Sequence, residues 1–193
     1  MPPRRRNGDE GNMKRVISLL LAVLLSVSVL AGCKEASTGG EAALSEAQIS
    51  EKLQTDFASS AKIKYKGIEA EAQIKKEGGG CTVDFTAPEN LAGMQFDLSG
   101  EKLGISYKGF HVDIDPNSAV GGAVVKLLVK ALTTAAEKNG VDISMEKNVV
   151  EIVSNQQSFQ FSLRLDGESG NILNLQIPDE ELDISFKNFT FLQ

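Results

Sequence analysis

From residue 44 onwards, the apolar residues of the chain recur with two different spacings. Ile49, Leu53 and Phe57 are four residues apart, which places one apolar stripe on a helix. Ser45 opens a Ser-x-x-Gln sequence, the capping-box pattern of a helix start. The pattern therefore predicts a helix over residues 45–60.

Short runs in which apolar and polar residues alternate make up most of the remaining chain. Turns that contain glycine or asparagine separate these runs, as expected for strands with short local connections. The alternation shifts by one residue at Gly67, which predicts a β-bulge there. About eight to eleven strands joined in this way indicate an antiparallel sheet and not a β-α-β fold. The predicted strands are 62–74 (interrupted at Gly67), 81–87, 94–98, 103–107, 110–114, 141–144, 149–153, 159–165, 172–177 and 182–192.

A mostly apolar helix is predicted between these strands. It lies between a start signal that begins with Asp115-Pro116 and a stop signal at Asn139-Gly140. Its polar residues form one narrow stripe, so the helix must be largely buried. Two interpretations remain open: ordinary core packing, and a helix that plugs the concave face of a curved sheet. The polar stripe consists of Lys126, Lys130, Thr133, Thr134 and Glu137.

Two adjacent glycines, Gly121 and Gly122, lie in the first turn of this helix. Each weakens a helix by about 1 kcal/mol relative to alanine. One interpretation is a hinge that lets the helix move as a lid over the sheet. The competing interpretation is that the missing side chains permit close packing of the helix on the sheet.

The N-terminal segment has the order of a bacterial export signal. Basic residues precede an almost wholly apolar run from Val16 to Leu30, and small residues and Cys33 follow. The apolar run is short for a helix that spans a bilayer. Met13 is an alternative to Met1 as the start of the protein, because the residues after it already make a complete signal.

The sequence Leu30-Ala31-Gly32-Cys33 resembles the lipobox of bacterial lipoproteins. This resemblance implies that the Cys33 thiol receives a diacylglycerol and that the chain is cut before it. Two or more acyl chains would then hold the protein stably on the extracytoplasmic face of the cell membrane. The alternative is an ordinary secreted protein with an incidental cysteine. The expected segments are a signal peptide (1–32), a lipidated tether (33–43) and a single domain (44–193).

Charge narrows the choice of partners. Removal of residues 1–32 takes away five of the 20 Lys and Arg and two of the 26 Asp and Glu, which leaves 15 basic and 24 acidic residues and a formal charge of −9. A chain this acidic lacks the basic surface that nucleic acids require. Anionic lipid headgroups should also repel it, so the predicted anchor must hold it at the membrane.

Residues that usually carry catalysis or bind metals are sparse. Cys81 would be the only unmodified thiol, and its alternation with Val83 and Phe85 predicts a buried structural thiol. The single histidine, His111, lies in a strand and points to its polar face. The sequence has no zinc-ligand spacing, no G-x-S-x-G turn and no phosphate-binding loop. We therefore expect no enzyme activity, no metal and no cofactor.

The order of these elements, together with the lipobox, resembles the lipoprotein carrier superfamily of LolA and LolB, including the LolA-like lipoproteins of Gram-positive bacteria. The resemblance implies an α+β fold in which a strongly curved antiparallel sheet, an incomplete barrel, has an N-terminal helix and an apolar helix packed on its concave face. The local likenesses are Pro88-x-x-Leu91-x-Gly93-Met94-x-Phe96, Asp166-Gly167-x-x-Gly170-x-Ile172 and Leu182-x-Ile184-x-Phe186-x-x-Phe189.

In that superfamily the concave face holds a hydrophobic cavity that accepts acyl chains. The resemblance implies that this chain, anchored through Cys33, holds or presents a lipid or another hydrophobic ligand. The alternative is an envelope protein-interaction module, for example in sporulation or germination, with a filled core and a protein partner. The residues expected to line the cavity are Phe85, Phe96, Tyr107, Val124, Leu128, Leu132 and Phe161.

Overall fold

The computed structural model describes residues 44–115 and 120–192. The expected signal peptide, lipobox and tether lie outside the described residues. The helices are α2 (Glu46–Gln54), α3 (Val120–Glu137) and the short 3₁₀ helix η1 (Pro178–Glu180). The strands are β1 (Phe57–Tyr65), β2 (Ile68–Glu77), β3 (Gly80–Ala87), β4 (Met94–Ser99), β5 (Lys102–Tyr107), β6 (Phe110–Ile114), β7 (Val141–Glu146), β8 (Val149–Ser154), β9 (Ser162–Asp166), β10 (Ile172–Ile177) and β11 (Leu182–Phe191).

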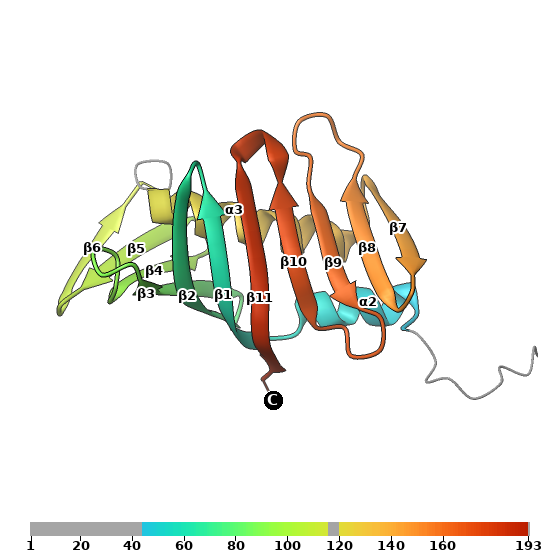
Figure 1. Ribbon diagram of the computed structural model, residues 1–193, viewed down its shortest axis with the longest axis horizontal. Coiled ribbons are helices and arrows are strands. Elements are labelled where there is room, and N and C mark those ends of the chain that lie inside the picture. Colours follow the sequence, from blue (N-terminus) through green and yellow to red (C-terminus); the bar gives the residue numbers. More distant parts are fainter. Residues whose placement is uncertain (1–43, 116–119, 193) are drawn as a thin grey trace, which may run out of the picture. The chain divides into compact units, whose positions relative to one another are not determined.

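All eleven strands form one antiparallel sheet in the order β6-β5-β4-β3-β2-β1-β11-β10-β9-β8-β7. The first strand pairs with the last, so the two halves of the chain meet at the β1–β11 pair. Strands β6 and β7 are the two free edges, and the curved sheet does not close into a barrel (Figure 1). The α+β fold with a curved, open sheet is as the sequence predicts.

Helix α2 is shorter than its pattern predicts. Ser45 does make the capping box, because its hydroxyl accepts a hydrogen bond from the backbone of Gln48. The helix ends at Gln54, however, and Phe57 is the first residue of β1. Phe57 fits the four-residue spacing of the helix, but it also continues the alternation of β1, in which Ala61 is buried. The prediction of a helix over residues 45–60 is therefore wrong at its C-terminal end.

The phase shift at Gly67 also has a different cause from the one predicted. Lys66 and Gly67, with φ of 48° and 79°, form a two-residue turn, and Tyr65 pairs directly with Ile68 across it. Positive φ at both positions is typical of the tight turns that match the twist of a hairpin. Residue 67 therefore joins two strands, and the predicted bulge within one strand is wrong.

The apolar helix α3 packs on the concave face of the sheet. It contacts β3, β4 and α2, and Figure 1 shows it running across the strands behind the sheet. The Ser50 hydroxyl of α2 donates a hydrogen bond to the Ala136 carbonyl of α3 at 2.6 Å, which joins the two helices. Neither helix of the described ranges is long and apolar enough to cross a membrane. The buried residues of α3 include Val124, Val125, Leu128, Ala131, Leu132 and Ala135.

Candidate hydrophobic binding site

A cavity of about 300 Å³, here called the apolar pocket, lies on the concave face beside the first turns of α3. Strands β1 to β5, the β3–β4 loop and α3 all contribute to its wall. Its volume is at the lower end of the range of about 300–1,000 Å³ that is usual for ligand sites. The lining residues are Ile63, Tyr65, Ile68, Ala70, Phe85, Leu91, Met94, Phe96, Ile105, Gly121 and Val124.

Strand alternation and register bring these residues to one face. Residues directly opposite each other in an antiparallel pair point the same way. Ile63 pairs with Ala70 across β1 and β2, and Phe96 pairs with Ile105 across β4 and β5. The alternation that buries one face of each strand therefore also builds the wall of the apolar pocket.

The first turn of α3 closes one side of the apolar pocket through a close contact. A Cβ atom added at Gly121 would overlap Cε2 of the Phe96 ring, so the missing side chain permits the observed approach of α3 to β4. The Phe96 ring meets Phe85 edge-on, with ring centroids 5.8 Å apart. This contact favours the close-packing interpretation of Gly121 over the hinge that we considered for Gly121 and Gly122.

Among the described residues that line the apolar pocket, none has a charged side chain, and Tyr65 alone has a side-chain hydroxyl. With this single hydrogen-bonding group, these residues have little means of holding a polar ligand whose groups must leave water. An apolar chain loses no hydrogen bonds on entering such a site and gains from leaving water. The chemistry of the wall therefore suits a hydrocarbon chain.

The residues expected from the sequence to line the cavity lie in several places. Phe85, Phe96 and Val124 line the apolar pocket, and Leu132 lines a second pocket described below. Leu128 and Phe161 are buried in the core. Tyr107 is half-buried and pairs with Met94 of the pocket wall.

Sequence reasoning did not select several lining residues, which are Ile63, Tyr65, Ile68, Ala70, Leu91, Met94 and Ile105. Leu91 and Met94 belong to one of the short sequences that resemble the superfamily, so the sequence could have identified them as candidate lining residues. The others required the strand register, because only the register shows which buried residues face the first turns of α3.

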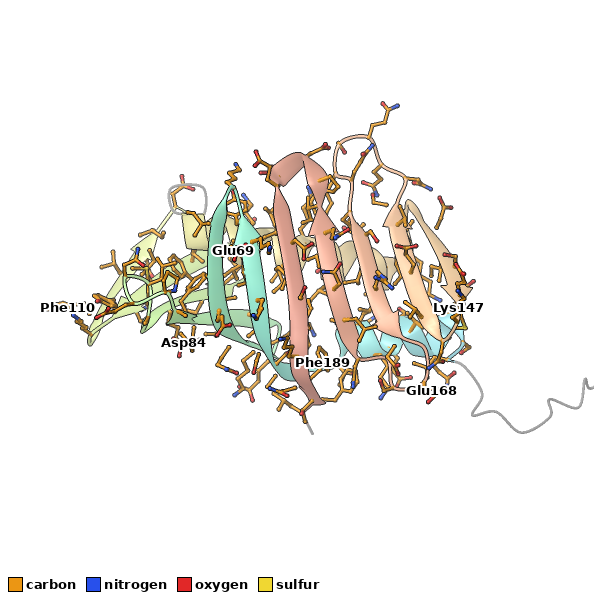
Figure 2. The ribbon with its side chains drawn as sticks, in the orientation of Figure 1. Glu69, Asp84, Phe110, Lys147, Glu168 and Phe189 are labelled. Carbon is orange, nitrogen blue, oxygen red and sulfur yellow. The ribbon has the colours of Figure 1, made fainter. Side chains whose placement is uncertain are left out.

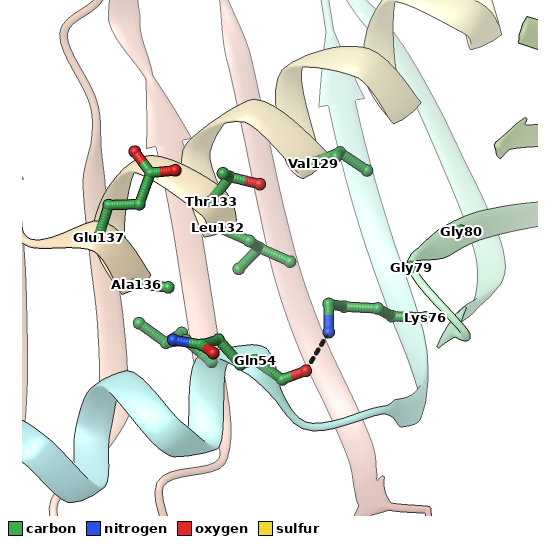
Figure 3. A pocket seen from close by; sticks show the side chains of 10 residues that line it. Gln54, Lys76, Gly79, Gly80, Val129, Leu132, Thr133, Ala136 and Glu137 are labelled. Carbon is green, nitrogen blue, oxygen red and sulfur yellow. Dashed lines mark hydrogen bonds between the residues drawn. The ribbon is translucent and has the colours of Figure 1, made fainter. Parts of the chain in front are cut away.

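A second cavity of about 360 Å³ lies between α2, α3 and the β2–β3 turn, and we call it the helix-junction pocket (Figure 3). Its wall includes the charged residues Lys76 and Glu137. The Lys76 ammonium donates hydrogen bonds to the carbonyls of Gln54 and Thr55, at 2.6 and 3.2 Å. Cations stabilise the carbonyl end of a helix, so Lys76 has a structural role at the end of α2. The larger of the two cavities is therefore not the better binding site.

Cys81 and His111 take the positions that the sequence predicts. Cys81 is 2% exposed, and burial raises the pKa of its thiol to about 12, so it is neutral and unreactive at physiological pH. Among the described residues, no cluster of three acidic, histidine or cysteine side chains could hold a metal ion.

His111 belongs to a small exposed network that the sequence did not reveal. Its Nδ1 lies 3.0 Å from the Ser106 hydroxyl, and its Nε2 lies 3.3 Å from Asp113 Oδ1. The three residue types are those of a catalytic triad, but the His111 and Asp113 side chains are 54% and 74% exposed. Neither pocket described above includes them. A triad also needs a substrate cleft and oxyanion donors, so this network gives no support for catalysis.

No protein-family profile and no curated protein sequence matches the chain. Solved structures do resemble it. An uncharacterized conserved protein from Thermus thermophilus has a TM-score of 0.50 and 11% identity, over 76% of this chain and 84% of that chain. LolA superfamily protein NE2245 from Nitrosomonas europaea has a TM-score of 0.38 and 13% identity, over 78% of this chain and 95% of that chain.

A chain in the structure of the CwlD amidase from Clostridioides difficile in complex with the GerS lipoprotein has a TM-score of 0.43 and 9% identity, over 98% of this chain and 100% of that chain. The solved structures that resemble this chain thus include a protein named as a member of the LolA superfamily and a chain from a complex that contains a lipoprotein. At these identities the likeness is one of fold.

Proposed function

We propose that the protein is a lipid-anchored envelope protein that holds an acyl chain, or a hydrophobic ligand of similar shape, in the apolar pocket. The observation that carries this proposal is a cavity of about 300 Å³ whose described lining residues have one hydroxyl and no charge. Binding of this kind is physical, so we propose no catalytic step and no cofactor.

The driving force is the removal of hydrocarbon from water. Burial of apolar surface contributes about 25 cal/mol per Å², or about 0.8 kcal/mol for each methylene group. The polar end of the ligand would remain outside, because the wall offers it no partner apart from the Tyr65 hydroxyl. Discrimination among ligands should therefore depend on chain length and shape more than on the headgroup.

The anchor is the second part of the proposal. Acylation of Cys33 would place the domain at the extracytoplasmic face of the membrane, next to a supply of acyl chains. Labelling of growing cells with an alkyne fatty acid tests this directly. The label should appear on the wild-type chain and be absent from Cys33→Ser, whereas undiminished label on Cys33→Ser would contradict the assignment.

Native mass spectrometry of the purified full chain tests the ligand. The expected spectrum contains a species heavier than the chain by the mass of one lipid, which organic extraction removes. A protein that never carries or accepts such a mass would refute the pocket as a lipid site. The alternative, an interaction module with a protein partner, would then be the better explanation of the fold.

A further inference from the structure

Two hairpins of the sheet have almost the same turn sequence. The β1–β2 turn is Tyr65-Lys66-Gly67-Ile68, and the β5–β6 turn is Tyr107-Lys108-Gly109-Phe110. Both are two-residue turns with positive φ, 48° and 79° in the first and 49° and 84° in the second. The same backbone geometry therefore presents a tyrosine, a lysine and a large apolar residue at each turn.

The side chains at the two turns also adopt matching positions. The Lys66 ammonium lies 5.2 Å from the Tyr65 ring centroid, and the Lys108 ammonium lies 5.0 Å from the Tyr107 ring centroid. The residue after each glycine is exposed, because Ile68 is 45% and Phe110 78% accessible. Each of the two turns therefore presents an exposed large apolar side chain beside a tyrosine and a lysine.

These two turns lie at the same end of the strands, and the apolar pocket lies between them. Successive antiparallel strands reverse direction, so the β1–β2, β3–β4 and β5–β6 connections all lie at this end of the sheet. Ile68 itself lines the pocket. On the other side, Met94 of the pocket wall pairs with Tyr107, which pairs with Phe110. Ile68 is thus part of the pocket wall, whereas Phe110 lies beside the pocket and outside its lining.

One further exposed residue extends this surface along β6. Val112 is 57% accessible and pairs with Ile105 of the pocket wall. Phe110 and Val112 alternate along the edge strand, so they share the face on which the pocket opens. Figure 2 shows Phe110 at the far end of the sheet from Lys147. We call Ile68, Phe110 and Val112, together with the two turns, the docking edge.

We propose that the docking edge rests on a phospholipid bilayer and holds the apolar pocket next to it. Tyrosine, lysine and exposed aliphatic or aromatic residues together suit the membrane interface, where rings and alkyl stems enter the hydrocarbon boundary and charges remain in the headgroup layer. This inference rests on the proposed function, because an acyl ligand would enter from the same surface.

The length of the expected tether points to the bilayer as the partner. Ten residues, 34–43, separate the acylated cysteine from Leu44, the first described residue, so the two Cα atoms are eleven steps apart along the chain. A chain of this length reaches at most about 36–40 Å when fully extended. The domain would therefore stay within reach of the membrane surface, whereas a protein partner would have to be present as well.

The charge of the protein predicts which lipid headgroup the docking edge binds. Lys66 lies 3.5 Å from Glu180, while Lys108 makes no ion pair within the described residues. The chain without residues 1–32 has a formal charge of −9. Docking should thus depend on insertion of apolar side chains and take place on phosphatidylcholine, which is zwitterionic and has no net charge, without help from anionic lipid.

The absence of tryptophan from the chain allows a direct test. Phe110→Trp introduces a single fluorophore at the docking edge, and Val153→Trp introduces one at a 40% exposed apolar position of β8, between the buried Ile152 and Ser154 and so on the opposite face of the sheet. Each acylated full chain is reconstituted in vesicles of phosphatidylcholine with brominated acyl chains, which quench tryptophan at the hydrocarbon boundary.

We expect several-fold stronger quenching for Phe110→Trp than for Val153→Trp. Equal quenching of the two, or no quenching of either, overturns the docking edge as a membrane contact and leaves a protein partner as the explanation of its exposed residues. Uptake of a free fluorescent fatty acid in solution is measured alongside. Phe110→Ser should weaken docking and leave uptake unchanged, so failure of docking and failure of the pocket are distinguishable.

Discussion

The concave face of the sheet differs between its two ends. Along β8, β9 and β10, Ile152, Leu163 and Leu175 are completely buried, and we call this region the closed part. Beside the first turns of α3, where the apolar pocket lies, Met94 and Ile105 are only half-buried, and we call this region the open part. Both parts come from strands with the same alternation of apolar and polar residues.

The helices that cover the concave face explain why one part is closed and the other open. The end of α3 is held by α2 through the Ser50–Ala136 hydrogen bond, and Lys130 of α3 lies 4.0 Å from the Phe159 ring centroid. At the start of α3, Gly121 brings the helix onto Phe96, but α2 does not contribute to the wall there. An alternating strand pattern thus predicts which face is apolar, while the covering elements decide whether that face is filled or hollow.

The largest effect should come from truncation in the closed part. Leu163→Ala removes a completely buried side chain and should lower the free energy of unfolding by about 2–5 kcal/mol. Ile105→Ala, in the open part, should cost clearly less because its side chain already borders empty space. Urea denaturation of both variants measures the difference. Equal losses would mean that the open part is packed as tightly as the closed part.

Enlargement of two alanines on one strand gives a sharper comparison. Ala70 and Ala72 both lie on β2 and face the core, but only Ala70 lines the apolar pocket. Ala72→Leu should destabilise the protein by about 1–3 kcal/mol because the extra methyl groups have no space. Ala70→Leu can extend into the cavity and should change stability little. Thermal melts compare the two, and a cost at residue 70 as large as that at residue 72 would contradict an open pocket.

The glycine at the start of α3 should show a smaller effect. Gly121→Ala gains up to about 1 kcal/mol of helix propensity but forces the Phe96 ring to move, at a typical cost of about 1–3 kcal/mol. We expect a net loss of about 1 kcal/mol in urea denaturation. A more stable variant that also takes up ligand more slowly would instead support the hinge interpretation.

The buried thiol should affect stability only at high pH. The folded protein holds the pKa of Cys81 at about 12, above its ordinary value of 9.0, so the unfolded chain loses this proton first. The stabilisation is complete below pH 9 and declines as the pH rises from 9 toward 12, by at most about 1.4 kcal/mol per pH unit. Urea denaturation against pH should show this extra decline in the wild type and not in Cys81→Ala. Identical pH dependence would contradict the burial of the thiol.

The sequence predicted the fold better than the site. Alternation and turn residues located the strands, the capping box located the start of α2, and the apolar helix was placed on the concave face. The predicted C-terminal end of α2 was wrong because Phe57 fits both the helical and the strand spacing. The site was harder because the predicted lining residues Leu128 and Phe161 are apolar and buried, like Phe85, yet lie outside the apolar pocket. The strand register and the position of α3 are needed to tell residues that line the pocket from residues that are buried in the core.

Titration of the protein with cis-parinaric acid, a fluorescent fatty acid, tests the central claim most directly. We predict saturable binding of one ligand per wild-type chain. Ala70→Leu should weaken this binding while it retains a cooperative thermal melt, because the larger side chain extends into the cavity and leaves less room for the ligand. Val153→Ser, on the opposite face of the sheet, should bind as the wild type does. No saturable binding by the wild type, or undiminished binding by Ala70→Leu, would contradict the assignment of the apolar pocket as the site of a hydrophobic ligand.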